Sequence, residues 1–330
     1  MENTAPEMRR VDIPGTIECP DPGVHYDVPA DDYHAWGAMN HSTINGFYES
    51  AAMGVHELSK TKETADLDFG QAFHTRFLEP DLFKSQYVVF DPNDGPINPS
   101  TKKPYGRDSQ TFQNWAVEFK STLQDGVKII SAEDAATIER MIDAVKKNPN
   151  ALGFATGGYK KREMCVVWDE VFRVRGEDVI VRCKARVDLY IDKLGEPINM
   201  PAMLDLKTAR SAIYEDFQRS IWDHGYHRQM AWYLRGLHRV GMMPMIHDRA
   251  AMILACEKSP PYHCAIYYID HGSIVQGIHE QRSNALAYIT WLMYGDAPGL
   301  PEKPRPISIP AWHAMSANEV NTTLIQGERL

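Results

Sequence analysis

The hydrophobic positions along this chain change their spacing near residue 160. Before it, apolar residues recur every three or four positions, as in amphipathic helices; after it come short runs rich in β-branched and aromatic residues, as in strands. The pattern predicts helices at 42–59, 65–77, 109–123, 132–147, 214–238 and 273–294, and strands at 162–168, 171–175, 179–190, 202–207, 250–256 and 263–269. This order predicts an α/β (α+β) fold with a central mixed β-sheet flanked by helices.

The two ends of the chain lack a clear period and are rich in proline. We therefore expect an extended N-terminal arm over 1–40, with a short strand near 26–28, a folded domain over 41–295 and a Pro-rich tail over 296–330. The segment 91–107 is polar and rich in turn residues, which predicts an exposed loop inside the domain.

Composition narrows the class of protein. The 330 residues are 43% hydrophobic and 24% charged, which is ordinary for a globular protein, and no run of about 18 apolar residues predicts a membrane span. The N-terminus lacks the basic-then-apolar pattern of a secretory signal, so we expect a cytoplasmic protein. The five cysteines are scattered without a CxxC pair, which argues against a disulfide framework and against a thiolate metal site.

The net charge of −9 is unusual for a protein that binds nucleic acid. Basic residues nevertheless gather between 161 and 210, and local charge matters more than the sum. A basic cleft in an acidic body is therefore compatible with the sequence. No GxxxxGK[ST] or GxGxxG motif occurs, which disfavours the folds that cradle nucleotide phosphates.

Three charged residues stand within apolar strands. Asp205 and Lys207 are two residues apart and share one face of a strand, and Asp188 lies in another strand, reached across a Gly-Pro turn at 194–197. An Asp-x-Lys pair taken alone is usually a salt bridge between neighbouring strand residues. Buried charges are seldom unpaired, so a second carboxylate nearby favours a cation site with an ammonium beside it.

Such a site suits hydrolysis of phosphodiesters, which one or two Mg²⁺ or Mn²⁺ ions between carboxylates assist. Asp188 and Asp205 are suitable ligands, and the backbone carbonyl of Leu206 is also available to the metal. We expect Lys207 to orient or deprotonate the attacking water, with its pKa lowered by desolvation and by the metal.

Four motifs occur in order along the chain: GQAFHTRFLEP with His74, KARVDLYI with Asp188, LDLKTA with Asp205 and Lys207, and GYHRQMAWYL with Gln229 and Tyr233. The ordered set resembles the PD-(D/E)xK nuclease superfamily, and specifically the RecE-type (exodeoxyribonuclease VIII-like) exonucleases of phages and prophages. The resemblance implies a restriction-endonuclease-like core over most of the folded part. Val187 stands where the superfamily often has a proline before the first aspartate.

The resemblance assigns roles to these residues. His74, Asp188 and Asp205 would be metal ligands and Lys207 the catalytic lysine, while Gln229 and Tyr233 would hold a DNA end or orient the lysine. Glu163 matches a further acidic position of this branch. Read from the residues alone, His74 is more often a buried core histidine. Gln229 and Tyr233 are then an ordinary pair on one helix face, with Tyr226 and Trp232 as core.

Four more residues are candidates for DNA contacts. Thr208 and Arg210 follow the lysine and can reach a phosphate, although solvated loop residues would have the same sequence. Lys184 and Arg186 share a strand face with Asp188 and are predicted to contact the DNA backbone, although a plain exposed strand edge would carry the same charges.

The resemblance implies a Mg²⁺- or Mn²⁺-dependent 5′-to-3′ exonuclease acting on linear double-stranded DNA ends in phage-type homologous recombination. It also implies a ring-like trimer or tetramer, a RecT-like single-strand annealing protein as partner, and the cytoplasm of a bacterial host. The alternatives are a structure-specific or nicking endonuclease, or a DNA-binding phage module without turnover. The complete His–Asp–Asp–Lys set argues against the latter, and the missing cysteine cluster argues against a Cas4-like nuclease.

Overall fold

The structure is a computed structural model in two compact units, residues 1–297 and 298–330, and the fold below is that of the first unit. The residues that it describes are 8–60, 65–124, 126–149, 151, 161–193, 200–243, 247, 249–300, 304, 306 and 307. For residues 65–67 only the backbone is described. The predicted turn at 194–197 and most of the predicted tail lie outside these residues.

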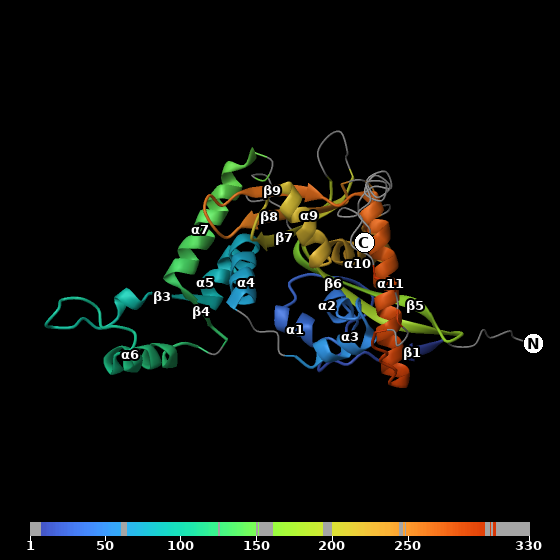
Figure 1. Cartoon of the computed structure of the whole chain (residues 1–330), viewed down its shortest axis with the longest axis horizontal. Coiled ribbons are helices and arrows are strands. Elements are labelled where there is room, and N and C mark those ends of the chain that lie inside the picture. The colour runs from blue at the N-terminus through green and yellow to red at the C-terminus, as the bar shows by residue number, and fades with distance from the viewer. Residues whose placement is uncertain are drawn as a thin grey trace, which may run out of the picture. The chain divides into compact units, whose positions relative to one another are not determined.

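A seven-stranded mixed sheet forms the centre of the first unit (Figure 1). Its strands are β1 (Arg9–Val11), β2 (Gly23–His25), β5 (Arg162–Val174), β6 (Glu177–Ile191), β7 (Ala202–Ala209), β8 (Ala251–Glu257) and β9 (Cys264–Tyr268). They follow the order β2-β5-β6-β7-β8-β9, and β1 also pairs with β6. The β1–β6 and β7–β8 pairs are parallel and the others antiparallel, which confirms the predicted mixed sheet.

Helices cover the sheet on both faces. The described helices of the first unit are α1 (Ala30–Ala35), α2 (His41–Asn45), α3 (Ala51–Leu58), α4 (Ala65–Leu78), α5 (Pro80–Gln86), α6 (Gln110–Ser121), α7 (Ala132–Lys147), α9 (Tyr214–Asp223), α10 (Tyr226–Arg239) and α11 (His271–Tyr294). Helix α6 packs its aromatic side chains on Phe90 and not on this sheet. Alternation along β7 separates two cores: Met203 packs in the cluster that contains α10 and α11, and Leu204 packs in the cluster that contains α4 and α7. Strand β7 is therefore covered on both faces.

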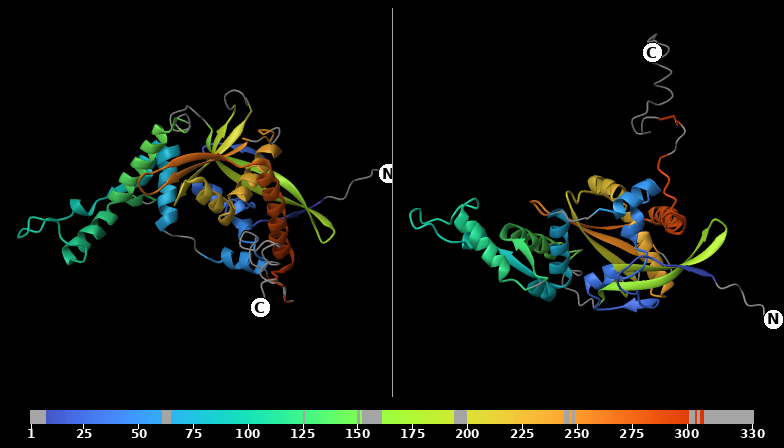
Figure 2. Two further views of the ribbon diagram at one scale, coloured as in Figure 1. Left: turned by 45° about the horizontal axis from the view of Figure 1, so that its top comes forward. Right: turned by 90° about the horizontal axis from the view of Figure 1, so that it is seen from below.

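Strands β5 and β6 form one long hairpin, visible in both views of Figure 2. The turn residues Arg175 and Gly176 both have positive φ, the conformation that two-residue hairpins prefer. The sequence predicted a break in β5 at residues 169–170. The strand continues because Glu170 is buried against Arg235 and Arg239 of α10. The polar residue Glu170 therefore marks a contact between the strand and α10, and not a turn.

Two predicted helices are each divided into two. Residues 42–59 form α2 and α3, because Ser50 accepts a hydrogen bond from the Met53 N–H and begins a new helix. Residues 214–238 form α9 and α10, because Gly225 adopts a left-handed φ of 69° between them. The positive φ strains any residue with a side chain, and a Cβ atom on Gly225 would also lie 2.3 Å from the guanidinium of Arg228, so this turn favours glycine.

The predicted N-terminal arm belongs to the sheet, since β1 pairs with β6 and β2 pairs with β5. The sequence also missed a small parallel sheet of β3 (Tyr87–Phe90) and β4 (Lys128–Ser131). The predicted loop 91–107 follows β3 and contains a short 3₁₀ helix, Pro92–Asp94. No helix in the described ranges is long and apolar enough to cross a membrane.

Candidate metal and catalytic site

Two neighbouring strands bring the predicted carboxylates together. The register pairs Leu189 of β6 with Leu204 of β7, and the Leu206 N–H donates a 2.7 Å hydrogen bond to Asp188 Oδ2. The same register sets Asp205 opposite Asp188, and Lys207 Nζ lies 2.7 Å from Asp205 Oδ2. Asp188 and Asp205 are both buried, so each needs a compensating charge or a bound cation.

A histidine and a glutamate join Asp188. His74 of α4 places Nδ1 3.5 Å from Asp188 Oδ2. The β5–β6 register pairs Arg162 with Leu189 and Met164 with Val187, which sets Glu163 opposite Asp188. One ligand atom from each of His74, Glu163 and Asp188 lies within 4.8 Å of the other two. The structure thus assembles a three-residue cluster from α4, β5 and β6.

The backbone at Glu163 is unusual. Its φ of 48° lies in the left-handed region, which non-glycine residues seldom adopt and which concentrates at functional sites. Arg186 of β6 holds the carboxylate through Nε, which donates to Glu163 Oε2. The conformation and the arginine together determine where the Glu163 side chain lies.

The protonation states of the cluster fit a divalent cation. Burial, and then the charge of the neighbouring Asp188, raise the pKa of Glu163 to about 7. Burial, and then the charge of Asp205, raise the pKa of Asp188 to about 7. Burial, and then the positive charge of Lys207, lower the pKa of His74, so its ring is neutral. An imidazole and two carboxylates that repel each other are a donor set suited to Mn²⁺ or Mg²⁺.

Asp205 lies beside this cluster and is held by α10. Gln229 Nε2 donates to Asp205 Oδ1 over 3.1 Å and to the Tyr233 hydroxyl over 2.9 Å. In the described residues the three-ligand cluster contains Glu163, while Asp205 contacts Lys207 and Gln229. The roles of Asp205 and of the Leu206 carbonyl as metal ligands stay predictions. The Leu206 backbone lies close enough to His74 to influence the pKa of its ring.

The prediction that the pKa of Lys207 is lowered was wrong for the chain without metal. Burial alone would lower it, but the charges of Asp205 and Asp188 outweigh burial and raise the pKa. Lys207 is therefore an ammonium, suited to binding and orienting oxygen atoms. Its Nζ also lies 5.0 Å from the centre of the Tyr226 ring, a contact that the sequence did not reveal. The sequence signal that could have revealed this contact is the spacing of Tyr226, Gln229 and Tyr233, which places all three on one face of α10.

The strand lysine and arginine predicted to contact DNA point into the protein. Lys184 is 1% exposed, and its Nζ donates to the carbonyl oxygens of Tyr33, His34 and Trp36. Arg186 donates to Glu163 and to the Val28 carbonyl. The prediction of a DNA contact was wrong for Lys184, because its ammonium is used within the fold. Arg186 instead orients a residue of the metal cluster.

The two candidates after the lysine lie nearer to solvent. Thr208 is half-buried, and its Oγ1 faces Gly70 of α4, where a Cβ atom would lie 3.6 Å away. Arg210 is exposed and has no ion-pair partner in the part of the chain that the structure describes. Arg210 is thus available to a phosphate, and its DNA contact stays a prediction.

The site is of the PD-(D/E)xK nuclease type. It combines a mixed sheet, one strand with Asp188, a second strand with Asp205 and Lys207, and a helix with His74. The chain belongs to the family described as "PDDEXK-like domain of unknown function (DUF3799)", whose model matches residues 40–303. The predicted superfamily is thereby confirmed, and the RecE type stays a prediction.

No curated protein matches the chain. Among solved structures, the chain is similar to a crystal structure from Eubacterium rectale described as a "Putative exonuclease". The two share 12% sequence identity with a TM-score of 0.49, over 92% of this chain and 100% of that one.

Proposed function

We propose that this chain is a divalent-metal-dependent deoxyribonuclease that degrades linear double-stranded DNA from its ends, in the 5′-to-3′ direction. One observation carries the proposal of metal-dependent hydrolysis: ligand atoms of His74, Glu163 and Asp188 lie within 4.8 Å of one another, beside the Lys207 ammonium. The preference for ends and the polarity rest on the resemblance to RecE-type enzymes.

Different side chains have different roles in the proposed hydrolysis. A Mg²⁺ or Mn²⁺ ion held by His74, Glu163 and Asp188 would supply charge neutralisation at the phosphate and a lowered pKa for an attacking water. Lys207 donates hydrogen bonds to a phosphate oxygen or to that water, which places the reacting atoms. Asp205 holds the ammonium at 2.7 Å, and Gln229 holds Asp205. The chain therefore positions the lysine through two successive polar contacts.

The proposal includes the biological setting that the resemblance implies. It places the enzyme in phage-type homologous recombination, in the cytoplasm of a bacterial host, with a RecT-like annealing protein. It also includes assembly into a ring-like trimer or tetramer. Light scattering on the purified chain tests the assembly, and a purely monomeric chain would contradict it.

The experiment that tests the activity compares linear with covalently closed circular duplex DNA, in Mg²⁺, in Mn²⁺ and in EDTA. We expect linear DNA to be degraded only with metal, and Lys207→Ala to lose this activity. The matched control is Lys146→Ala, which changes a lysine on α7 that pairs with Asp143 outside the site. DNA labelled at the 5′ or the 3′ end reports the polarity.

Each other outcome has a definite meaning. Cleavage of circular DNA would indicate a nicking or structure-specific endonuclease. Activity in EDTA, or activity that survives Lys207→Ala, would contradict the assigned site. DNA binding without cleavage under any condition would indicate a binding module.

A further inference from the structure

The Lys207 ammonium has few partners for a buried charge. The Lys207 side chain is 17% exposed, and Asp205 is its one ion-pair partner in the described ranges. An ammonium has three N–H donors, and a buried charge needs most of its polar directions compensated. The charge of Asp188 also favours the ammonium, and the face of the Tyr226 ring lies against it, with the ring centre 5.0 Å from Nζ.

A second buried lysine shows how much Lys207 depends on the ring. Lys184 Nζ also lies over a tyrosine ring, 4.9 Å from the centre of Tyr33, but it donates to three carbonyl oxygens as well. Within the described part of the chain, no backbone carbonyl accepts a hydrogen bond from Lys207. Removal of the ring should therefore leave Asp205 as the one contact that fixes the Lys207 ammonium, whereas three carbonyl oxygens would still hold Lys184 without Tyr33.

Contacts other than Lys207 hold the Tyr226 ring. The left-handed Gly225 ends the α9–α10 turn and makes Tyr226 the first residue of α10. The rings of Phe217 and His224 pack against Tyr226, with centres 6.1 and 5.4 Å away. The Tyr226 hydroxyl forms no hydrogen bond to a described residue. The orientation of the ring thus depends on packing, and its hydroxyl is dispensable for the fold.

Helix α10 contacts both members of the Asp-x-Lys pair. Gln229 binds Asp205, and Tyr226, three residues earlier on the same helix face, covers Lys207. The ring blocks one side of the ammonium and Asp205 occupies another. Because an ammonium has three N–H donors, Asp205 and the ring leave at least one of them for a substrate oxygen.

We propose that Tyr226 is a positioning residue: the face of its ring holds the Lys207 ammonium against Asp205 so that one N–H is directed at the scissile phosphate. The role in hydrolysis rests on the function proposed above. The contact itself belongs to the chain and exists whether or not DNA is cleaved.

Kinetics of two substitutions test the role. We expect Tyr226→Leu to lower kcat by about 10- to 30-fold, the factor that corresponds to a lost cation–π contact at a partly desolvated site. KM should change by less than about twofold, because ground-state binding is not affected. Tyr226→Phe keeps the ring and should recover most of the lost kcat. Equal losses in both variants, or wild-type kcat in Tyr226→Leu, would overturn the proposal.

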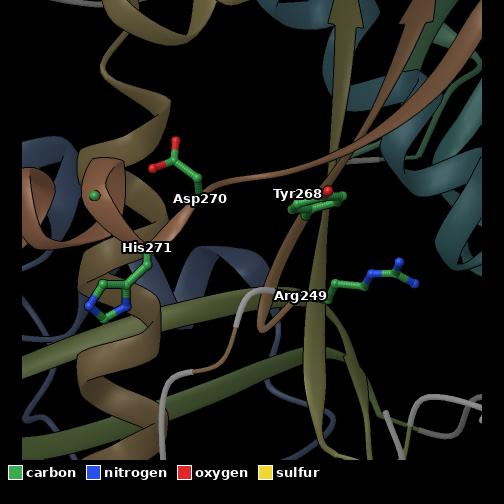
Figure 3. A pocket seen from close by; sticks show the side chains of 5 residues that line it. Arg249, Tyr268, Asp270 and His271 are labelled. Atoms are coloured by element: carbon green, nitrogen blue, oxygen red, sulfur yellow. The ribbon is translucent and has the colours of Figure 1, made fainter. Parts of the chain in front are cut away.

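The matched control is Tyr268→Leu. Tyr268 is an exposed tyrosine with the Arg249 guanidinium 5.7 Å from its ring centre. Figure 3 shows both side chains beside Asp270 and His271, around a cavity of about 470 Å³ that no residue of the proposed site lines. We expect wild-type kcat in this variant. A loss as large as that in Tyr226→Leu would show a general sensitivity to surface tyrosines and would overturn the assignment.

A nuclear magnetic resonance measurement tests the contact without any activity. Protons on the Lys207 side chain end should be shifted upfield by the Tyr226 ring, with the signals assigned by their loss in Lys207→Met. The shift should persist in Tyr226→Phe and disappear in Tyr226→Leu. Unshifted Lys207 signals in the wild-type chain would overturn the proposal even if Tyr226→Leu fails to fold. An inactive chain with shifted signals would contradict the proposed nuclease function and leave the contact established.

Discussion

Gln229 Nε2 donates a 3.1 Å hydrogen bond to Asp205 Oδ1, so a helix on one face of the sheet fixes a carboxylate of its central strand. The same nitrogen lies 2.9 Å from the Tyr233 hydroxyl, one helical turn further along α10. Asp205 is 2% exposed, so few other groups can satisfy this oxygen. The helix therefore determines which way the Asp205 carboxylate faces.

Replacement of Gln229 by alanine tests this relationship. The change leaves Asp205 Oδ1 buried without its donor, which should lower the free energy of unfolding by about 1–3 kcal/mol and also lower kcat. Chemical denaturation and DNA degradation measure the two effects. Gln110→Ala is the control, since Gln110 binds Asn114 at the surface and should change neither quantity. Unchanged stability in Gln229→Ala would contradict the assigned contact.

The raised carboxyl pKa values predict how stability depends on pH. The pKa values of Asp188 and Glu163 rise to about 7 in the folded chain, from ordinary values of 3.8 and 4.5. Between these limits the folded chain binds more protons than the unfolded chain, so its free energy of unfolding falls as pH rises from about 4 to about 7. Wild type should therefore lose stability relative to Glu163→Gln over this window. Thermal unfolding in EDTA measures the difference.

A bound cation should reverse this trend. Mn²⁺ competes with protons for the same carboxylates, so its stabilisation of the fold should be larger at pH 8 than at pH 5. The Tm with and without Mn²⁺ at both pH values gives the result. Asp188→Asn should remove most of the effect. An equal increase in Tm at both pH values would contradict a site built on Asp188 and Glu163.

His74 supplies a prediction about metal affinity. Its lowered pKa keeps the ring neutral, so Nδ1 can bind a metal beside Asp188. We expect His74→Ala to weaken Mn²⁺ binding by at least about tenfold, measured by calorimetry. His271→Ala is the control, because His271 is exposed and lies at the cavity of Figure 3. Unchanged affinity in His74→Ala would make His74 a packing residue of α4.

The salt dependence of DNA binding separates Arg210 from Lys184. Arg210 is exposed, so Arg210→Gln should reduce the slope of log K against log salt by about 1 if it contacts a phosphate. Lys184→Met should leave the slope unchanged and should lower the free energy of unfolding by roughly 3 kcal/mol, because buried carbonyls lose their donor. Fluorescence anisotropy at several salt concentrations in EDTA measures the slopes. A reduced slope for Lys184→Met would contradict its buried position.

Local signals predicted some elements well. Helix α7 was predicted at 132–147 and is observed at Ala132–Lys147. Ser131 accepts a hydrogen bond from the Asp134 N–H at its start, and the apolar stripe that includes Ile138 and Met141 is buried. Both signals act within one helix, so they are complete in the sequence.

Other features depend on partners far along the chain. The break at Gly225 was missed because a single glycine in a helical pattern is tolerated, whereas here its left-handed φ ends one helix and begins the next. Strand β1 was missed, and the short strand predicted near 26–28 is observed as β2 at Gly23–His25, because each strand has three residues and is defined by pairing with β6 or β5. Short strands of this kind have little period of their own.

The sequence by itself determined the charged residues at the centre of this protein. Strand alternation puts Asp205 and Lys207 on one face, and the motifs add Asp188 and His74. Only the tertiary structure decided what covers each face. It places Glu163 opposite Asp188, turns Lys184 inward and sets the Tyr226 ring beside Lys207. The physical reason is that the period of a strand or helix specifies the direction in which each side chain points. The residues that a side chain meets are set by strand register and helix packing between segments far apart in the sequence.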